Sequence, residues 1–176
     1  MAEKDVKEIE YLINESYDLD LDMLNWNHML EQGLIQYINL ETIYIKQVRD
    51  HFNLEKLRKW SPNFAFDAMY GSSQNVFKKL FPEAYLLHCE FNPTFKGIPP
   101  EPIHKNLFEL SEYVWCNNEA KFGFAVDGDG DRVAVYDNEG NFINAHHTIL
   151  LLIHYLAGYR KLDGKVVVFV SGDFKG

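Results

Sequence analysis

The residues best suited to chemistry lie in the stretch FGFAVDGDGDRVAVYDNEG, from Phe122 to Gly140. Asp127, Asp129 and Asp131 stand there at alternate positions, separated only by glycines. Three carboxylates this close together repel one another and raise one another's pKa values unless a cation lies among them. Aspartate oxygens are hard ligands that suit Mg²⁺, Mn²⁺ or Ca²⁺ better than zinc. The spacing therefore predicts a site for a hard metal ion.

The neighbours of the aspartates support the same interpretation. Gly128 and Gly130 lack β-carbons where the backbone has to bend for three side chains to converge. Arg132 follows at once and offers a planar fork for a phosphate group. Because Mg²⁺ is commonly held by a few carboxylates and a phosphate oxygen, we expect a metal site that works on phosphates.

An EF-hand calcium loop and an ordinary surface turn are the two alternatives to such a site. The EF-hand loop also opens with alternating aspartates, but it needs Gly at its sixth position and Glu at its twelfth. Arg132 and Asn138 stand at those positions, and strand-forming residues rather than helices flank the loop. An acidic surface turn is the second alternative, since Asp-Gly is also simple turn chemistry. We favour the metal site over both.

The flanking segments predict the elements that hold the loop. The patterns indicate strands in NFAFDA, AYLLHCEF, FGFAV, RVAVY and KVVVFVS, and helices in QNVFKKLF, HKNLFELSEYVWC and AHHTILLLIHYLAGY. Strands that alternate with helices predict an α/β fold, a three-layer α/β/α sandwich with a mixed sheet. We expect FGFAV and RVAVY to be adjacent strands or one bent strand pair, and the aspartate loop to lie at one edge or end of the sheet.

The chain before about Trp60 has a different sequence pattern, which is helical. Val6, Ile9 and Leu12 recur at helical spacing, and Asn53 is suited to cap a short last helix, LEKLRKW. We therefore predict a helical N-terminal segment over residues 1–60 and an α/β metal-binding domain over residues 61–176.

Composition excludes several classes of function. The 176 residues are 47% hydrophobic and 15% aromatic, enough for a packed core, and the net charge of −9 argues against nucleic-acid and anionic membrane surfaces. Cys89 and Cys116 form no CxxC motif and predict reduced thiols in a cytoplasmic protein. The longest apolar run, Ile149 to Ile153, is far shorter than the roughly 20 residues of a membrane span.

DGDGDR between two strands resembles the metal-binding loop of the α-D-phosphohexomutases, the phosphoglucomutase and phosphomannomutase superfamily. The resemblance extends to FAFDAMYGSS, FKGIPPEP and NLFELSEYV. It covers roughly Tyr37 to Val170, all within the second of four family domains.

The resemblance implies a function for the loop. Family members convert hexose 1-phosphates to 6-phosphates through a bisphosphorylated sugar, using a phosphoserine of the first domain. Mg²⁺ would bridge that phosphoserine to Asp127, Asp129 and Asp131, and Arg132 would act as a catalytic residue on the phosphoserine or substrate side. The partners implied are a hexose phosphate and the remaining domains of the same polypeptide.

The departures from the family pattern limit what the chain is expected to do. The phosphoserine loop, the sugar-recognition motif and the phosphate-binding loop of the other domains are missing from the sequence. We therefore expect a domain fragment that is inactive alone and binds Mg²⁺ weakly, on the order of millimolar, because water must complete the metal shell. The alternative is a stand-alone module that binds a divalent cation and acts by interaction.

The remaining polar residues receive simpler interpretations. Gly71, Ser72 and Ser73 open a helix after a strand, and we favour a plain turn over an anion site because no phosphate-binding motif is present. His88 lies inside an apolar run and is interpreted as a core or edge histidine. His146 and the histidine after it are interpreted as surface or capping residues.

Overall fold

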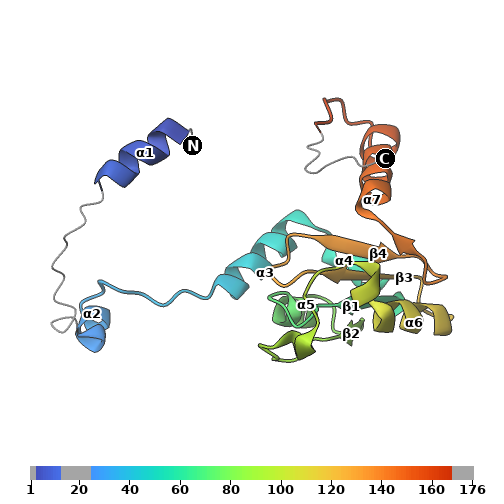
Figure 1. The fold of residues 1–176 in the computed structure, drawn as a ribbon, viewed down its shortest axis with the longest axis horizontal. Helices are drawn as coiled ribbons and strands as arrows, with labels where there is room; N and C mark the ends of the chain where they lie inside the picture. The colour runs from blue at the N-terminus through green and yellow to red at the C-terminus, as the bar shows by residue number, and fades with distance from the viewer. Residues whose placement is uncertain (1–2, 13–24, 168–176) are drawn as a thin grey trace. The chain divides into compact units, whose positions relative to one another are not determined.

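The computed structural model describes residues 3–12 and 25–167 (Figure 1). Packing divides the chain into two compact units, residues 1–40 and residues 41–176. The first unit contains helix α1 (Glu3–Leu12) and helix α2 (Trp26–Glu31). Asn25 caps α2 by accepting a hydrogen bond from the backbone N–H of His28 at 3.1 Å. Helices are described in parts of the segment predicted to be helical, whereas residues 32–39 lie outside any helix.

The second unit is built on a five-stranded mixed sheet with the order β2-β1-β3-β4-β5. Its strands are β1 (Phe64–Asp67), β2 (Tyr85–Leu87), β3 (Phe122–Val126), β4 (Val133–Tyr136) and β5 (Phe142–Ile143). Strand β1 is parallel to β2 and to β3, whereas β4 is antiparallel to β3 and to β5. The predicted mixed sheet and the predicted pairing of FGFAV with RVAVY are confirmed.

Helices cover both faces of the sheet, which makes three layers (Figure 1). On one face, α6 (Phe108–Cys116) buries Leu110 and Val114 against the small residues of β1, β3 and β4. Gly123 in β3 lies directly under α6, where a β-carbon would come within 2.8 Å of Val114. A side chain at this position would therefore push the helix off the sheet.

The opposite face is aromatic. Phe66 of β1 stacks on Phe77 of α5 (Gln74–Leu80), with ring centroids 3.7 Å apart. Helices α3 (Leu40–His51) and α4 (Leu54–Arg58) belong to the same compact unit, because Ile45 and Leu54 pack with Leu80 at the end of α5. The domain limit between residues 60 and 61 that the sequence predicts stays a prediction.

Several local expectations can be compared with the backbone. Asn53 caps α4 as predicted, accepting the N–H of Lys56 at 2.9 Å. The strand predicted over AYLLHCEF is shorter than expected, because His88 has a φ of 49° and cannot continue an extended strand. The helix predicted from His104 opens with a 3-10 turn. Three 3-10 helices are described, at Ser61–Asn63, Phe95–Gly97 and His104–Asn106.

The predicted apolar helix near the end of the chain is confirmed. It consists of α7 (Ala145–Ile153) and a π-helix, η5 (His154–Tyr159), with Asn144 accepting the N–H of His147 as the N-cap. Its large apolar side chains are not buried, and those exposed are Ile149, Leu150, Leu151, Leu152, Tyr155, Leu156 and Tyr159.

The strand predicted over KVVVFVS is wrong over its first three residues. Residues 165–167 lie outside any strand, and both Val166 and Val167 are exposed. The reason is that no described strand pairs with them, since β2 and β5 end the described sheet. The remainder of the predicted strand lies outside the described residues. Within 3–12 and 25–167, no helix is both long and apolar enough to cross a membrane.

Candidate metal centre

The aspartate loop, residues 127–132, joins β3 to β4 at the end of the sheet (Figure 1). A second loop, the turn AMYGSS at residues 68–73, follows the carboxyl end of β1. Since β1 and β3 are parallel neighbours, their carboxyl ends lie at the same end of the sheet, and the two loops meet there. Open α/β sheets usually carry their ligand sites at the carboxyl ends of their strands.

The structure brings the three predicted ligands together. Asp127, Asp129 and Asp131 each offer one oxygen, and these oxygens lie within 4.8 Å of one another. Asp127 is buried with 1% of its surface exposed, whereas Asp129 and Asp131 are open to solvent. A small cation could therefore be approached from the solvent side while one ligand stays fixed in the protein.

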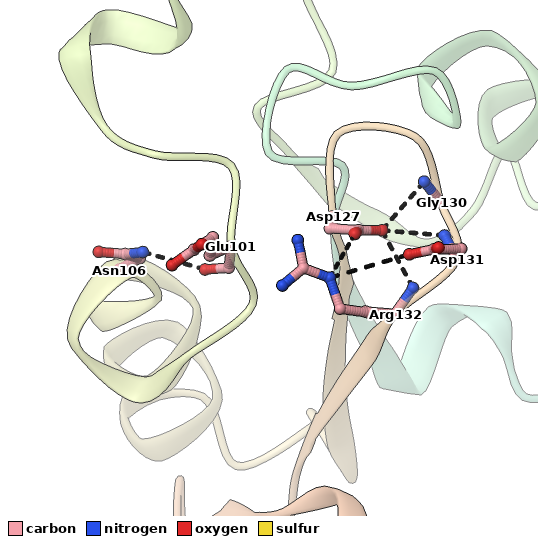
Figure 2. A network of polar contacts seen from close by, with 6 residues as sticks. All are labelled: Glu101, Asn106, Asp127, Gly130, Asp131 and Arg132. Atoms are coloured by element: carbon pink, nitrogen blue, oxygen red, sulfur yellow. Dashed lines mark hydrogen bonds and ion pairs between the residues drawn. The ribbon is translucent and has the colours of Figure 1, made fainter. Parts of the chain in front are cut away.

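Asp127 is held in place by four hydrogen bonds (Figure 2). Its Oδ1 accepts the backbone N–H groups of Gly130, Asp131 and Arg132 at 3.0, 2.9 and 3.0 Å. Its Oδ2 accepts Nε–H of Arg132 at 2.7 Å. These bonds close the loop around one carboxylate, which explains how so short a segment turns back into β4.

The pKa values of the aspartates do not all shift in the direction that the sequence predicts. Burial favours the neutral form of Asp127, but the backbone and side-chain hydrogen bonds from Arg132 outweigh it and hold the pKa of Asp127 well below its usual range. The predicted rise is therefore wrong for this residue. For Asp131 it is confirmed, because its interaction with the Asp127 carboxylate and the charge of Asp129 raise the pKa of Asp131.

Arg132 links the aspartate loop to a third segment. Its Nε lies 3.8 Å from Oδ1 of Asp131 in addition to its bond with Asp127. The guanidinium points toward Glu101 in the proline-rich segment, and the attraction of these carboxylates, Asp127 first, raises the pKa of Arg132 (Figure 2). Asn106 fixes that segment by donating to the backbone oxygen of Glu101 at 3.0 Å.

Two segments hold the loop at Gly128. The backbone oxygen of Gly128 accepts the N–H of Ser72 at 2.9 Å, and its N–H donates to the oxygen of Pro100 at 3.2 Å. A β-carbon on Gly71 would lie 2.5 Å from the Gly128 oxygen. Gly71 and Ser72 thus support the aspartate loop, a role that sequence reasoning missed because the contact joins residues far apart in the chain.

The arrangement fits a hard divalent cation. All the converging donors are carboxylate oxygens, two of them on exposed side chains, and the ligand type is the one that Mg²⁺ and Mn²⁺ prefer. An arginine beside the same carboxylates suits a negatively charged group next to the ion. Chemically, the site can bind a hard cation and an adjacent phosphate.

Comparison with known proteins gives a consistent result. Residues 42–140 match the family described as phosphoglucomutase/phosphomannomutase, alpha/beta/alpha domain II. A probable phosphoglucosamine mutase of Methanothermobacter thermautotrophicus is 28% identical over 80% of the chain and 30% of its own length. The phosphoglucosamine mutase of Clostridium beijerinckii is 31% identical over 76% of the chain and 31% of its own length.

A solved structure has the same fold. The putative phosphomannomutase of Thermus thermophilus superposes with a TM-score of 0.67 and 26% identity, over 92% of this chain and 35% of that one. The chain thus spans about a third of the length of the relatives that it matches.

Proposed function

The chain belongs to the phosphoglucomutase/phosphomannomutase family through its domain II, and from that premise we propose that it contributes the Mg²⁺-binding loop of a phosphohexomutase. The observation that carries the proposal is the convergence of three carboxylate oxygens within 4.8 Å, where the loop after β3 meets the turn after β1. The relatives are named as mutases acting on phosphorylated glucose, glucosamine or mannose. The substrate class proposed is therefore a hexose phosphate.

Asp127, Asp129 and Asp131 would hold the metal. A divalent cation held by these residues would supply charge neutralisation for a transferring phosphoryl group. Asp127 would supply the rigid ligand because backbone N–H groups fix its carboxylate. The two exposed aspartates would adjust to the ion.

Arg132 would bind the phosphate. Its Nε is engaged by Asp127, which orients the guanidinium, and its terminal nitrogens point toward Glu101 (Figure 2). A guanidinium held in this way presents N–H donors in a fixed plane, the geometry that phosphate oxygens accept. Glu101 opposite would keep the arginine near the loop between turnovers.

The chain on its own would lack the rest of the machinery. Family members take the phosphoserine and the sugar pocket from other domains, and the chain spans about a third of its relatives' length. We propose that the purified chain has no mutase activity with glucose 1-phosphate or mannose 1-phosphate plus a bisphosphate activator. Turnover above that of an Asp129→Asn preparation would show this part of the proposal to be wrong.

Metal titration tests the site itself. Calorimetry with Mn²⁺ and Mg²⁺ should give a dissociation constant on the order of millimolar for the parent chain. The double variant Asp129→Asn/Asp131→Asn should bind at least tenfold more weakly, while Glu112→Gln, which removes an exposed carboxylate on α6, should bind as the parent does. Submicromolar binding by the parent, or equal binding by the double variant, would contradict the proposed site.

A further inference from the structure

A second polar pair lies behind the metal loop and takes no part in it. Asp67, the last residue of β1, is fully buried. Its Oδ1 accepts the backbone N–H of Met69 at 2.7 Å, and both of its oxygens lie 2.9 Å from Nδ1 of His88. A buried carboxylate is costly unless it is fully bonded, so the placement of this pair must serve some purpose in the fold.

The pair stands where the backbone is strained. Met69 and Tyr70 have φ values of 46° and 59°, and His88 itself has 49°. A non-glycine residue in the left-handed region is strained and persists only where its surroundings fix it. Here the fixing contacts are those of Asp67 and the bond from the Tyr70 N–H to the His88 oxygen, at 3.0 Å.

The strained turn is in direct contact with the metal loop. The N–H of Ser72 holds the Gly128 oxygen at 2.9 Å, and Gly71 leaves no room for a β-carbon against the same residue. Further along, the Ser73 hydroxyl lies 3.1 Å from where a β-carbon of Gly130 would be. Gly128 and Gly130 flank Asp129, so a shift of the turn would move the metal ligands.

The groups around His88 favour its protonated form and so raise its pKa. The bond to Asp67 comes first among the causes that raise the pKa of His88, and burial acts against it. Nε2 of His88 lies 3.3 Å from Oε2 of Glu109 on α6, and Lys96 is the nearby cation that opposes protonation. The Tyr70 ring packs on the imidazole at 4.6 Å between centroids.

We propose that Asp67 and His88 are positioning residues of the metal site, which fix the turn at residues 68–71 so that it holds Gly128 and, through it, the three aspartates. The inference rests on the proposed function of the aspartate loop. Neither residue touches the metal or the substrate. They act through Met69, whose backbone N–H donates to Asp67, and through Ser72, whose backbone N–H donates to the oxygen of Gly128.

Two substitutions of one residue separate positioning from bulk stability. In His88→Asn the amide nitrogen lies as many bonds from Cβ as Nδ1 does, so it can still donate to Asp67, and asparagine accepts a positive φ. In His88→Gln the amide corresponds to Nε2 and is directed to Glu109 instead. Both variants lose the ring against Tyr70, so they differ in the bond to Asp67 and in how well the residue tolerates the positive φ at position 88. Glu109→Gln removes the other ion pair as a control.

The first readout is Mn²⁺ affinity by electron paramagnetic resonance on the full chain, with near-ultraviolet circular dichroism and melts in chelator to measure folding. We expect His88→Gln to bind Mn²⁺ about tenfold more weakly, as loss of outer-shell partners commonly does. His88→Asn and Glu109→Gln should stay within about twofold of the parent. A folded His88→Gln chain with parental affinity would overturn the proposal, even if its melting temperature were lower.

The second readout needs no metal. In amide NMR spectra recorded in chelator, the Gly128 and Gly130 resonances should shift in His88→Gln and stay near their parental positions in the two other variants. If the parent failed to bind Mn²⁺, the proposed function would fall, while these spectra would still decide whether His88 positions the loop. Unchanged glycine resonances in His88→Gln would overturn the inference.

Discussion

The carboxyl ends of β1 and β3 and the helix α7 with η5 are built in opposite ways. At the strand ends, glycines bring two loops into contact, and a buried carboxylate at the start of each loop has several bonded partners. Along α7, strongly apolar residues form a regular helix whose side chains are exposed. Specific polar contacts between distant segments fix the first region, whereas the hydrogen bonds described for the second, including its Asn144 cap, are local.

The difference shows that hydrophobicity alone does not place an element. Helix α7 is more apolar than α6, yet α6 buries Leu110 and Val114 completely, because glycine and alanine on the sheet beneath leave room for them. The family match also stops at residue 140, before α7 begins. Stability and function should therefore be concentrated in the first region.

We expect the largest difference in stability between substitutions of one leucine in each region. Leu110→Ala removes a fully buried side chain and should lower the free energy of unfolding by about 2–5 kcal/mol. Leu151→Ala, at a side chain 59% exposed, should change it by less than about 0.5 kcal/mol. Urea denaturation measures both. Similar losses in the two variants would mean that α7 is packed as tightly as α6.

Substitution of one glycine in each region should sharpen the comparison between them. Gly71→Ala places a β-carbon 2.5 Å from the Gly128 oxygen, and we expect it to cost about 1–3 kcal/mol and to weaken Mn²⁺ binding. Gly164→Ala, after η5, meets no atom within 4 Å and should leave both quantities unchanged. Denaturation and Mn²⁺ titration of each protein test this. Parental Mn²⁺ binding by Gly71→Ala would contradict the support that the turn gives the loop.

The stability of the first region should also depend on pH. The pKa of His88 is raised in the folded protein, mainly by its bond to Asp67. The stabilisation that protonated His88 provides is therefore fully present below the pKa of the unfolded state, about 6.5, and is lost as the pH rises through the pKa of the folded state. We expect the melting temperature to fall over that window, by less than Leu110→Ala lowers it. In His88→Asn this dependence should disappear. An equal slope in both proteins would assign it to other groups.

The smallest effect on stability is expected at the exposed aspartates. Asp129→Asn should weaken Mn²⁺ binding while leaving the melting temperature in chelator unchanged or slightly higher, because one of three mutually repelling carboxylates is removed. The charge of Asp129 is one cause of the raised pKa of Asp131, after the side-chain bond between Asp131 and Asp127. Glu112→Gln serves as the control for net charge. Unfolding of Asp129→Asn in chelator would mean that the loop is a structural rather than a metal-binding element.

The sequence by itself determined the features that depend on neighbours along the chain. Runs of strand-forming apolar residues predicted β3 and β4 on either side of the aspartates, Asn53 predicted a helix start, and the glycines predicted a sharp loop. These follow from local backbone preferences and from repulsion between adjacent charges, which a short stretch of residues contains in full. The motif DGDGDR was enough to indicate the family.

Only the tertiary structure decided which distant groups meet. Nothing near Asp67 in the chain reveals that His88 binds its carboxylate, because the parallel pairing of β1 with β2 brings these two residues together. In the same way, the pairing of β1 with β3 brings Ser72 to Gly128. Hydrogen bonds from Arg132 reversed the pKa shift expected for Asp127. The exposure of α7 and the missing strand at residues 165–167 have the same origin. An apolar pattern states that a segment can be buried, and a partner elsewhere in the fold decides whether it is.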